Sequence, residues 1–429
     1  GPLQSAIRYY YAEVGAQQAA QTANEGFAGS DAELVRIEES ESGDPEAPIV
    51  KLLSSLLDRA VSTGASDIHI EPFEGKTRVR MRIDGTIVDY VTLERSVHQP
   101  LIARIKIMAN LDIAERRLPQ DGHFRIRAGQ EGHVNIRVSL LPTVFGEKAV
   151  LRILAAASHV DHAEHFGMDD DSYARFLPML NSPNGIIYLT GPTGSGKSTT
   201  LYMVLEYLSR RQVNISTVED PVEQNVPGIN QTQVNPVAGL TFESGLRALL
   251  RQDPDIIMVG ETRDGETAGI SVRAAITGHL VLSTLHTNDA VSSVVRLADM
   301  GVDRYLIANS LVGLVAQRLM RKVCPHCARE AAVTPQEQAL LGRDIRTVRR
   351  GAGCMHCNGT GYRGRIAVHE IVAVDRSIRR MISRGAEAEE IEAYAREHQG
   401  MKSLREKGLE LVREGVTTPE ELLRIAYYA

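Results

Sequence analysis

The sequence predicts an α/β fold built on a mostly parallel sheet, with a smaller α+β domain before it and a cysteine-rich module after it. The first observation is a glycine-rich stretch at residues 191–199, which matches the pattern G-x-x-x-x-G-K-[ST]. An apolar run at residues 185–190 precedes it and a helix-compatible run at residues 201–208 follows it. The second observation is that helical and strand patterns alternate over residues 172–323, which is typical of a parallel sheet.

The strand–loop–helix context identifies residues 191–199 as a phosphate-binding P-loop. Its glycines let the backbone curl so that N–H groups face a phosphate, and the following helix adds its positive end. Lys197 is expected to neutralise the β- and γ-phosphates of ATP, and Ser198 to hold Mg²⁺. The predicted nucleotide-binding residues are Gly191, Pro192, Thr193, Gly194, Ser195, Gly196, Lys197, Ser198 and Thr199.

Length and composition describe an ordinary globular protein with more than one domain. A chain of 429 residues is too long for a single core, so two or three domains are expected. Hydrophobic residues make up 43% and charged residues 24%. The formal net charge of −6 argues against a general nucleic-acid binder. Apolar runs fall short of the roughly 20 residues that span a bilayer.

The region before the P-loop divides into three parts. Residues 1–48 are acidic and poor in apolar residues, so we expect a linker, and the opening Gly-Pro-Leu suggests a protease-cleavage scar. Residues 49–155 are expected to form an α+β domain. Its predicted elements are helices at 48–57 and 101–108, a hairpin of strands 78–83 and 86–91, and strands at 134–138 and 148–154.

Residues 156–171 are predicted to be an interdomain linker. They contain three histidines, His159, His162 and His165, which could suggest a metal site. Their irregular surroundings and the lack of a nearby cysteine favour a solvated linker.

The strand that partners a P-loop is predicted at residues 256–259, which are all apolar. Glu261 follows this strand, at the end where ligands bind in such sheets, and we expect it to position or polarise the attacking water. The Asp that usually precedes this Glu is replaced by Gly260. Magnesium coordination must therefore depend more on Ser198, the phosphates and water.

A second acidic group follows a predicted strand at residues 215–218. Glu219, Asp220 and Glu223 lie within five residues, and three carboxylates suit a hydrated Mg²⁺. A simple Asp-Pro turn explains the same pattern, and spacing alone does not decide between the two.

Two histidines, His279 and His286, bracket an apolar strand. Seven extended steps separate them by roughly 23 Å, so they cannot share one metal. His286 is expected at the carboxyl end of the strand, where it could sense a γ-phosphate. His279 is expected at the opposite end.

The four cysteines form two Cys-x-x-Cys pairs, which suit a tetrahedral Zn²⁺ with no open position and hence a structural role. His326 and His356 lie inside the pairs and are expected to be bystanders. A metal site in a reduced, intracellular setting explains these cysteines better than disulfide bonds do. The predicted zinc ligands are Cys324, Cys327, Cys354 and Cys357.

The order of these motifs resembles the secretion ATPase superfamily of type II secretion and type IV pilus assembly. The resemblance covers about residues 48–429, and within it glycine before the catalytic glutamate is the family's usual pattern. The segments that show it are residues 65–72, 116–123, 146–152, 191–199, 217–223, 251–264 and 277–289.

The resemblance implies an ATP-hydrolysing homo-hexamer that drives pilus or pseudopilus assembly through an inner-membrane platform protein. It would be cytoplasmic and peripheral to the inner membrane, and would bind no nucleic acid. Residues 172–323 would be a RecA-like motor, residues 324–373 a zinc module and residues 374–429 a helical subdomain. Arg137 and Arg152 match the family's arginines that reach across to bound nucleotide.

The cysteines resemble pilus-extension rather than pilus-retraction ATPases. The family's first N-terminal domain is not in the sequence, so we expect a truncated form. Two alternatives stay open: a DNA-uptake or conjugation ATPase of the same superfamily, and a nucleotide-gated scaffold with little turnover.

Overall fold

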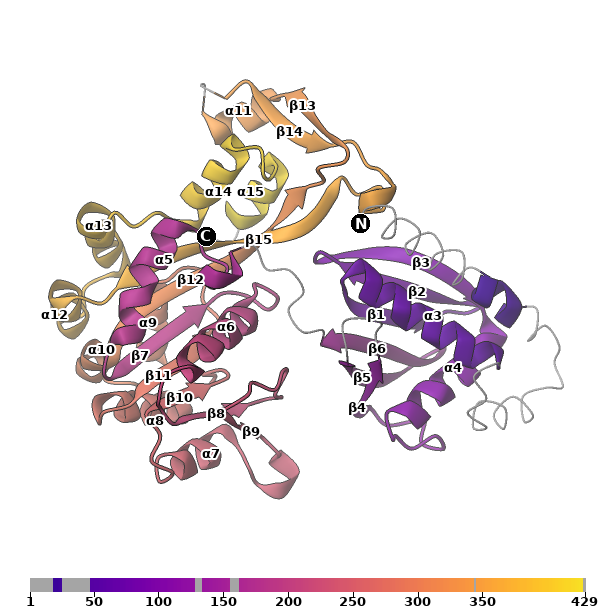
Figure 1. The fold of residues 1–429 in the computed structure, drawn as a ribbon, viewed down its shortest axis with the longest axis horizontal. Helices are drawn as coiled ribbons and strands as arrows, with labels where there is room; N and C mark the ends of the chain where they lie inside the picture. Colours follow the sequence, from indigo (N-terminus) through magenta and orange to yellow (C-terminus); the bar gives the residue numbers. More distant parts are fainter. Residues whose placement is uncertain (1–17, 25–46, 128–132, 155–161, 343–344, 427–429) are drawn as a thin grey trace. The chain divides into compact units, whose positions relative to one another are not determined.

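The structure is a computed structural model, and it describes residues 18–24, 47–127, 133–154, 162–342 and 345–426. The chain forms two compact units, residues 1–158 and 159–429 (Figure 1). Most of the predicted linker at residues 1–48 lies outside the described residues, as does His159.

The first unit is a six-stranded antiparallel sheet in the order β3-β2-β1-β6-β5-β4, with helices packed against it. The predicted hairpin is confirmed as β2 and β3, which pair through a turn at Asp84 and Gly85. The core contains the apolar face of α3, including Leu52, Leu53 and Leu56. The elements are α3 (Pro48–Thr63), β1 (Ala65–Pro72), β2 (Lys76–Ile83), β3 (Thr86–Glu94), α4 (Arg95–Met108), β4 (Gln120–Arg127), β5 (His133–Thr143) and β6 (Gly146–Leu154).

The second unit is built on a seven-stranded sheet in the order β15-β12-β7-β11-β10-β8-β9. All neighbouring pairs from β12 to β9 are parallel, and β15 alone runs antiparallel. Strands β7, β8, β10 and β11 are buried along their whole length, which suits the apolar runs in β7, β10 and β11. The strands are β7 (Gly185–Thr190), β8 (Ile215–Glu219), β9 (Asn230–Gln233), β10 (Ile256–Val259), β11 (Leu280–Leu285), β12 (Leu311–Val323) and β15 (Tyr362–Ala373).

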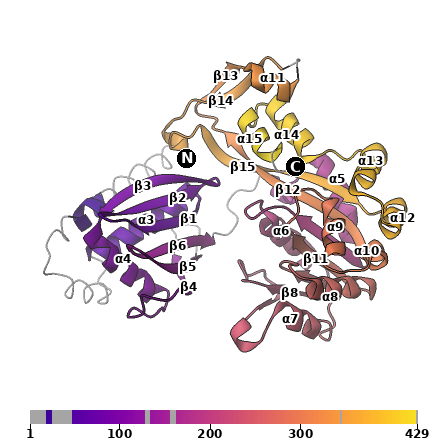
Figure 2. The same ribbon diagram turned by 180° about the vertical axis from the view of Figure 1, so that it is seen from behind.

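Helices cover both faces of this sheet, and Figure 2 shows the arrangement from behind. One apolar cluster lies under α5 and α6, and a larger one lies under the remaining helices. The helices are α5 (Asp170–Phe176), α6 (Lys197–Ser209), α7 (Phe242–Leu249), α8 (Gly265–Ile276), α9 (Ser292–Asp299), α10 (Arg304–Ser310), α12 (Arg376–Arg384), α13 (Ala388–Gln399), α14 (Leu404–Arg413) and α15 (Pro419–Ala426).

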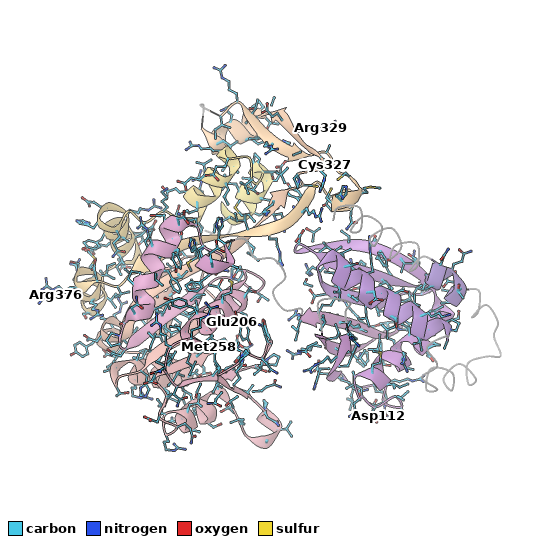
Figure 3. All side chains as sticks on the ribbon, viewed as in Figure 1. Asp112, Glu206, Met258, Cys327, Arg329 and Arg376 are labelled. Atoms are coloured by element: carbon cyan, nitrogen blue, oxygen red, sulfur yellow. The ribbon has the colours of Figure 1, made fainter. Side chains whose placement is uncertain are left out.

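The cysteine pairs lie in the segment between β12 and β15. One pair precedes and the other follows a small two-stranded sheet of β13 (Ala328–Ala332) and β14 (Thr347–Gly351), whose strands are connected through α11 (Pro335–Leu341). Cys327 and Arg329 mark this region in Figure 3, away from Met258 in the large sheet. The predicted module boundary of 324–373 includes β15, but β15 pairs along its length with β12. The segment is thus an insertion between two neighbouring strands of the large sheet.

Among the residues that the structure describes, no helix is long and apolar enough to cross a membrane.

Candidate nucleotide-binding site and metal centre

The P-loop connects β7 to α6 with three glycines at positive φ: Gly191 at 147°, Gly194 at 79° and Gly196 at 88°. A Cβ on Gly191 would lie 2.5 Å from the carbonyl oxygen of Gln317 and 3.0 Å from Nη1 of Arg318. The loop therefore needs glycine both for its backbone conformation and for the close approach of β12. The helix predicted at residues 201–208 is confirmed as α6, but it begins four residues earlier, at Lys197, so its N-terminus lies at the loop.

Lys197 is buried, and among the described residues no carboxylate forms an ion pair with it. Its Nζ donates to the carbonyl oxygens of Gly191, at 2.7 Å, and Pro192, at 3.1 Å. Burial, together with the nearby charge of Arg318, lowers the pKa of Lys197 to about 8, and the Glu261 carboxylate partly opposes this change. Phosphate oxygens would supply the negative charge that this buried ammonium lacks.

Glu261 follows β10, at the sheet edge where β11 also ends. Its carboxylate forms an ion pair with Arg263, and one oxygen lies 3.6 Å from Nε2 of His286. Because β10 and β11 are parallel neighbours, their carboxyl ends bring Glu261 and His286 together. The structure thus joins two predicted site residues that are 25 positions apart, and their roles in catalysis stay predictions.

Glu219 ends β8 and is buried, unlike Asp220 and Glu223, which are exposed. Its carboxylate accepts hydrogen bonds from the hydroxyl of Tyr202, from Thr217 Oγ1 at 2.5 Å and from Gln231 Nε2 at 3.0 Å.

Tyr202 lies one helical turn after Ser198 on α6, so the network of Glu219 reaches the helix face that carries the predicted magnesium ligand Ser198. In the structure, the carboxylate of Glu219 orients the side chains of Tyr202, Thr217 and Gln231. Its predicted part in catalysis stays a prediction.

His279 lies at the opposite end of β11 from His286, as expected. Its Nδ1 is 2.9 Å from the carbonyl oxygen of Ala274, near the end of α8. This contact links the residue before β11 to the last turn of α8, so His279 has a structural contact here.

Gln317 and Arg318 are site residues that the sequence analysis missed. Both are buried on β12. Gln317 Nε2 donates to the carbonyl oxygen of Ser195 at 2.9 Å, and its Oε1 accepts from Thr200 Oγ1 at 3.0 Å. The signal was present: a polar pair interrupts the otherwise apolar run of residues 311–320.

Arg137 and Arg152 lie in the first unit as directly opposed residues on β5 and β6. Both are exposed, and Nε of Arg152 is 3.1 Å from Oδ1 of Asp67. The two arginines therefore form one exposed cationic pair on the sheet. Their reach to a nucleotide stays a prediction.

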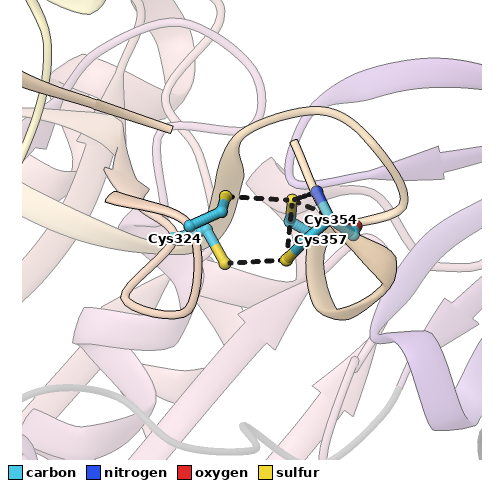
Figure 4. Close-up of side chains that lie close together, drawn as sticks. Cys324, Cys354 and Cys357 are labelled. Carbon is cyan, nitrogen blue, oxygen red and sulfur yellow. Dashed lines mark hydrogen bonds between the residues drawn. The ribbon is translucent and has the colours of Figure 1, made fainter. Parts of the chain in front are cut away.

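The four cysteine Sγ atoms form one cluster (Figure 4). The Sγ–Sγ distances are 3.8 Å for Cys324–Cys354, 3.8 Å for Cys327–Cys357 and 3.7 Å for Cys354–Cys357. Four sulfurs about 2.3 Å from a zinc ion in tetrahedral geometry would be about 3.8 Å apart. The donor set therefore fits Zn²⁺.

The histidines beside the cysteine cluster and those of the predicted linker lie in different surroundings. His326 and His356 stack on each other at 4.0 Å between ring centroids and are not part of the cysteine cluster. In the predicted linker, ligand atoms of His162, Glu164 and His165 lie close together. However, His165 already pairs with Asp170 at 3.1 Å, and His162 is exposed.

A family model described as "Type II/IV secretion system protein" matches residues 42–424. The chain belongs to this family. The predicted family resemblance is therefore confirmed.

Curated relatives agree. The chain is 49% identical over 383 residues to "Type IV pilus assembly ATPase PilB" of Thermus thermophilus, covering 88% of this chain and 43% of that protein. It is 44% identical over 396 residues to "Type II secretion system ATPase E" of Vibrio cholerae, covering 92% and 78%. The chain thus spans less than half of the first relative and about three quarters of the second.

Solved structures of other proteins share the fold. The ATPase DotB of Legionella pneumophila superposes with a TM-score of 0.64 at 21% identity, over 88% of this chain and 95% of that one. The pilus retraction motor PilT with bound ADP superposes with a TM-score of 0.58 at 25% identity, over 86% and 95%. The predicted α/β fold class is confirmed.

Proposed function

We propose that this chain is an ATPase that powers the assembly of a type IV pilus or a type II secretion pseudopilus. The observation that carries the proposal is the edge formed by β7, β10 and β11. There, a desolvated Lys197 faces the P-loop, and Glu261 and His286 end the neighbouring strands. The ATPase names of relatives at 44–49% identity support the same activity.

Each site residue has a distinct task in hydrolysis. Lys197 and the N–H groups of the P-loop bind the β- and γ-phosphates. Glu261 orients the attacking water and accepts its proton, with His286 beside it. Mg²⁺ held by Ser198 would neutralise phosphate charge.

The finer parts of the proposal concern assembly. We propose a homo-hexamer at the cytoplasmic face of the inner membrane that acts on a platform protein. In this hexamer, Arg137 and Arg152 would supply positive charge to a nucleotide bound at a P-loop. The exposure of both arginines supports a role outside their own sheet.

Hydrolysis by Glu261→Gln protein tests the activity. Turnover should fall at least about 100-fold while ADP affinity stays unchanged, because the substitution removes the base and keeps the shape. Glu243→Gln, which changes a half-buried carboxylate on α7 that pairs with Arg247, is the matched control. If wild-type protein turns over as slowly as Glu261→Gln, even when assembled, the chain is a nucleotide-gated scaffold. Salt-dependent DNA binding would instead favour a DNA-transport ATPase.

We also propose that the four cysteines hold a structural Zn²⁺. The backbone N–H groups of Cys354 and Gly361 each lie 3.2 Å from Sγ of Cys357 and would stabilise its thiolate. Metal analysis should give one zinc per chain, and Cys354→Ser should lose it. Well under one zinc in protein purified without chelators would refute the site.

A further inference from the structure

Arg318 is a buried guanidinium next to the P-loop, with 6% of its surface exposed. Its Nη2 donates to the carbonyl oxygen of Asn288 at 2.9 Å, and its Nη1 is the atom that Gly191 approaches. Among the described residues, no ion pair includes Arg318. Burial lowers its pKa, which Glu370 and Asp289 partly oppose from a distance.

Arg318 and Lys197 are thus two buried cations that repel each other at one site. Bringing two like charges out of water is costly unless a partner compensates them. The partner that this site is built to receive is a polyphosphate. A bound polyphosphate would compensate both charges at once.

Together, Gln317 and Arg318 connect β12 to two loops. On one face of β12, Gln317 is bonded to Ser195 of the P-loop and to Thr200 of α6. On the other face, Arg318 holds the carbonyl oxygen of Asn288, two residues after His286.

The loop after β11 is held at a second point as well. Oε1 of Glu370 on β15 accepts the N–H of Ala290 at 2.9 Å, and its Oε2 accepts that of Leu404 on α14 at 3.3 Å. Residues 286–290 are therefore held by two neighbouring strands. One is β12, which adjoins the P-loop strand β7, and the other is β15, which pairs antiparallel with β12.

We propose that Arg318 is a positioning residue with two roles: its charge raises affinity for nucleoside di- and triphosphates, and its bond to Asn288 orients His286. The first role needs only nucleotide binding. The second rests on the proposed ATPase function. Binding of nucleotide phosphates near Arg318 would then influence the position of the loop that contains His286, through the bond from Arg318 to Asn288.

The test compares three variants of the whole chain: Arg318→Gln, Arg318→Lys and Arg321→Gln as control. Arg321 lies on the same strand but pairs with Glu421, with Nη2 to Oε1 at 2.8 Å. Its loss should lower thermal stability without changing nucleotide affinity. ADP and adenosine affinity, thermal stability and ATP turnover are measured for each variant.

Arg318→Gln should weaken ADP binding about tenfold or more and leave adenosine binding unchanged, because only the phosphates need the charge. Arg318→Lys should retain most ADP affinity because the positive charge stays. It should lower turnover because an ammonium cannot both lie beside the P-loop and reproduce the guanidinium's bond to Asn288. Should Arg318→Gln fail to fold, Arg318→Lys alone still tests the second role.

Two results would overturn the proposal. Wild-type ADP affinity in Arg318→Gln, or an equal loss in Arg321→Gln, would refute the charge role. Full wild-type turnover in Arg318→Lys would refute the positioning role. A wild-type chain that binds ADP normally but does not hydrolyse ATP would instead overturn the proposed function and leave the binding results interpretable.

Discussion

The two units of this chain present cations in opposite ways. In the second unit, Lys197 and Arg318 are buried beside the P-loop, and burial lowers the pKa of each. In the first unit, Arg137 and Arg152 face solvent on neighbouring strands, and the side chain of Arg152 is 57% exposed. One set of charges is desolvated before any ligand arrives, whereas the other is desolvated only on contact.

This difference suggests a division of labour. Buried, preorganised charges lose little on binding phosphate, so they suit affinity. Exposed arginines cost their own unit little and retain five donors each, so they suit a contact made only when another surface arrives. Four experiments can break or sharpen this contrast.

The largest effect is expected on turnover. Arg137→Ala and Arg152→Ala should each lower the turnover of the assembled protein by about 10³-fold, the typical contribution of an arginine that stabilises phosphoryl-transfer charge. ADP affinity of the unassembled chain should not change. Arg125→Ala, an exposed arginine of β4 that bonds Asn135, is the control. Equal turnover in all three variants would remove the exposed arginines from the mechanism.

The second effect concerns the buried carboxyl of Glu370. Burial raises its pKa from 4.5 to about 7, with Asp289 and Glu392 adding to the shift. The folded state then binds a proton more tightly than the unfolded state. The stability from this group is therefore full below about pH 4.5 and is lost as pH rises through about 7.

The loss should reach at most about 3 kcal/mol in the free energy of unfolding, at 1.36 kcal/mol per pKa unit. Urea unfolding of the second unit from pH 5 to 8 measures it, with Glu370→Gln beside wild type. Glu370→Gln should show a smaller decline with pH. The same decline in both proteins would contradict the role of Glu370.

The third effect is the pH dependence of nucleotide affinity. Phosphate favours the charged form of Lys197, so binding must raise its pKa above about 8. ADP affinity should therefore fall as pH rises above about 8, by up to about tenfold per unit. Titrations between pH 7.5 and 9.5 test this, and Arg137→Ala protein should show the same slope. A flat profile in wild type would mean that Lys197 is not desolvated.

The smallest effect is on the stability of the first unit. Like charges directly opposite on neighbouring strands are destabilising, so Arg137→Ala should raise the free energy of unfolding by a few tenths of a kcal/mol. Denaturant unfolding of the whole chain, followed by a probe in the first unit, gives the value. A loss above about 1 kcal/mol would show that Arg137 stabilises its own sheet.

Much of the fold followed from local patterns. The apolar spacing of residues 48–57, the turn at Asp84 and Gly85, and the buried runs of β7, β10 and β11 predicted their elements correctly. The cysteine cluster followed from two short cysteine spacings, because each pair is fixed by its own turn. Such signals depend on neighbours in sequence, so sequence suffices.

Other features depend on contacts between distant segments. Local spacing left Glu219 open between magnesium binding and a turn. Its partners come from α6, β8 and β9, which only the folded sheet brings together. Likewise, β15 follows the cysteine module in sequence but pairs with β12 in space.

By itself, the sequence determined the P-loop, the strand that places Glu261, the cysteine cluster and the family. Each is a short pattern with strict local stereochemistry. Only the tertiary structure placed Gln317 and Arg318 beneath the P-loop, more than a hundred residues away in sequence. The reason is the strand order: β12 adjoins β7, so its buried polar pair meets the phosphate-binding backbone, and spacing along the chain cannot reveal that neighbour.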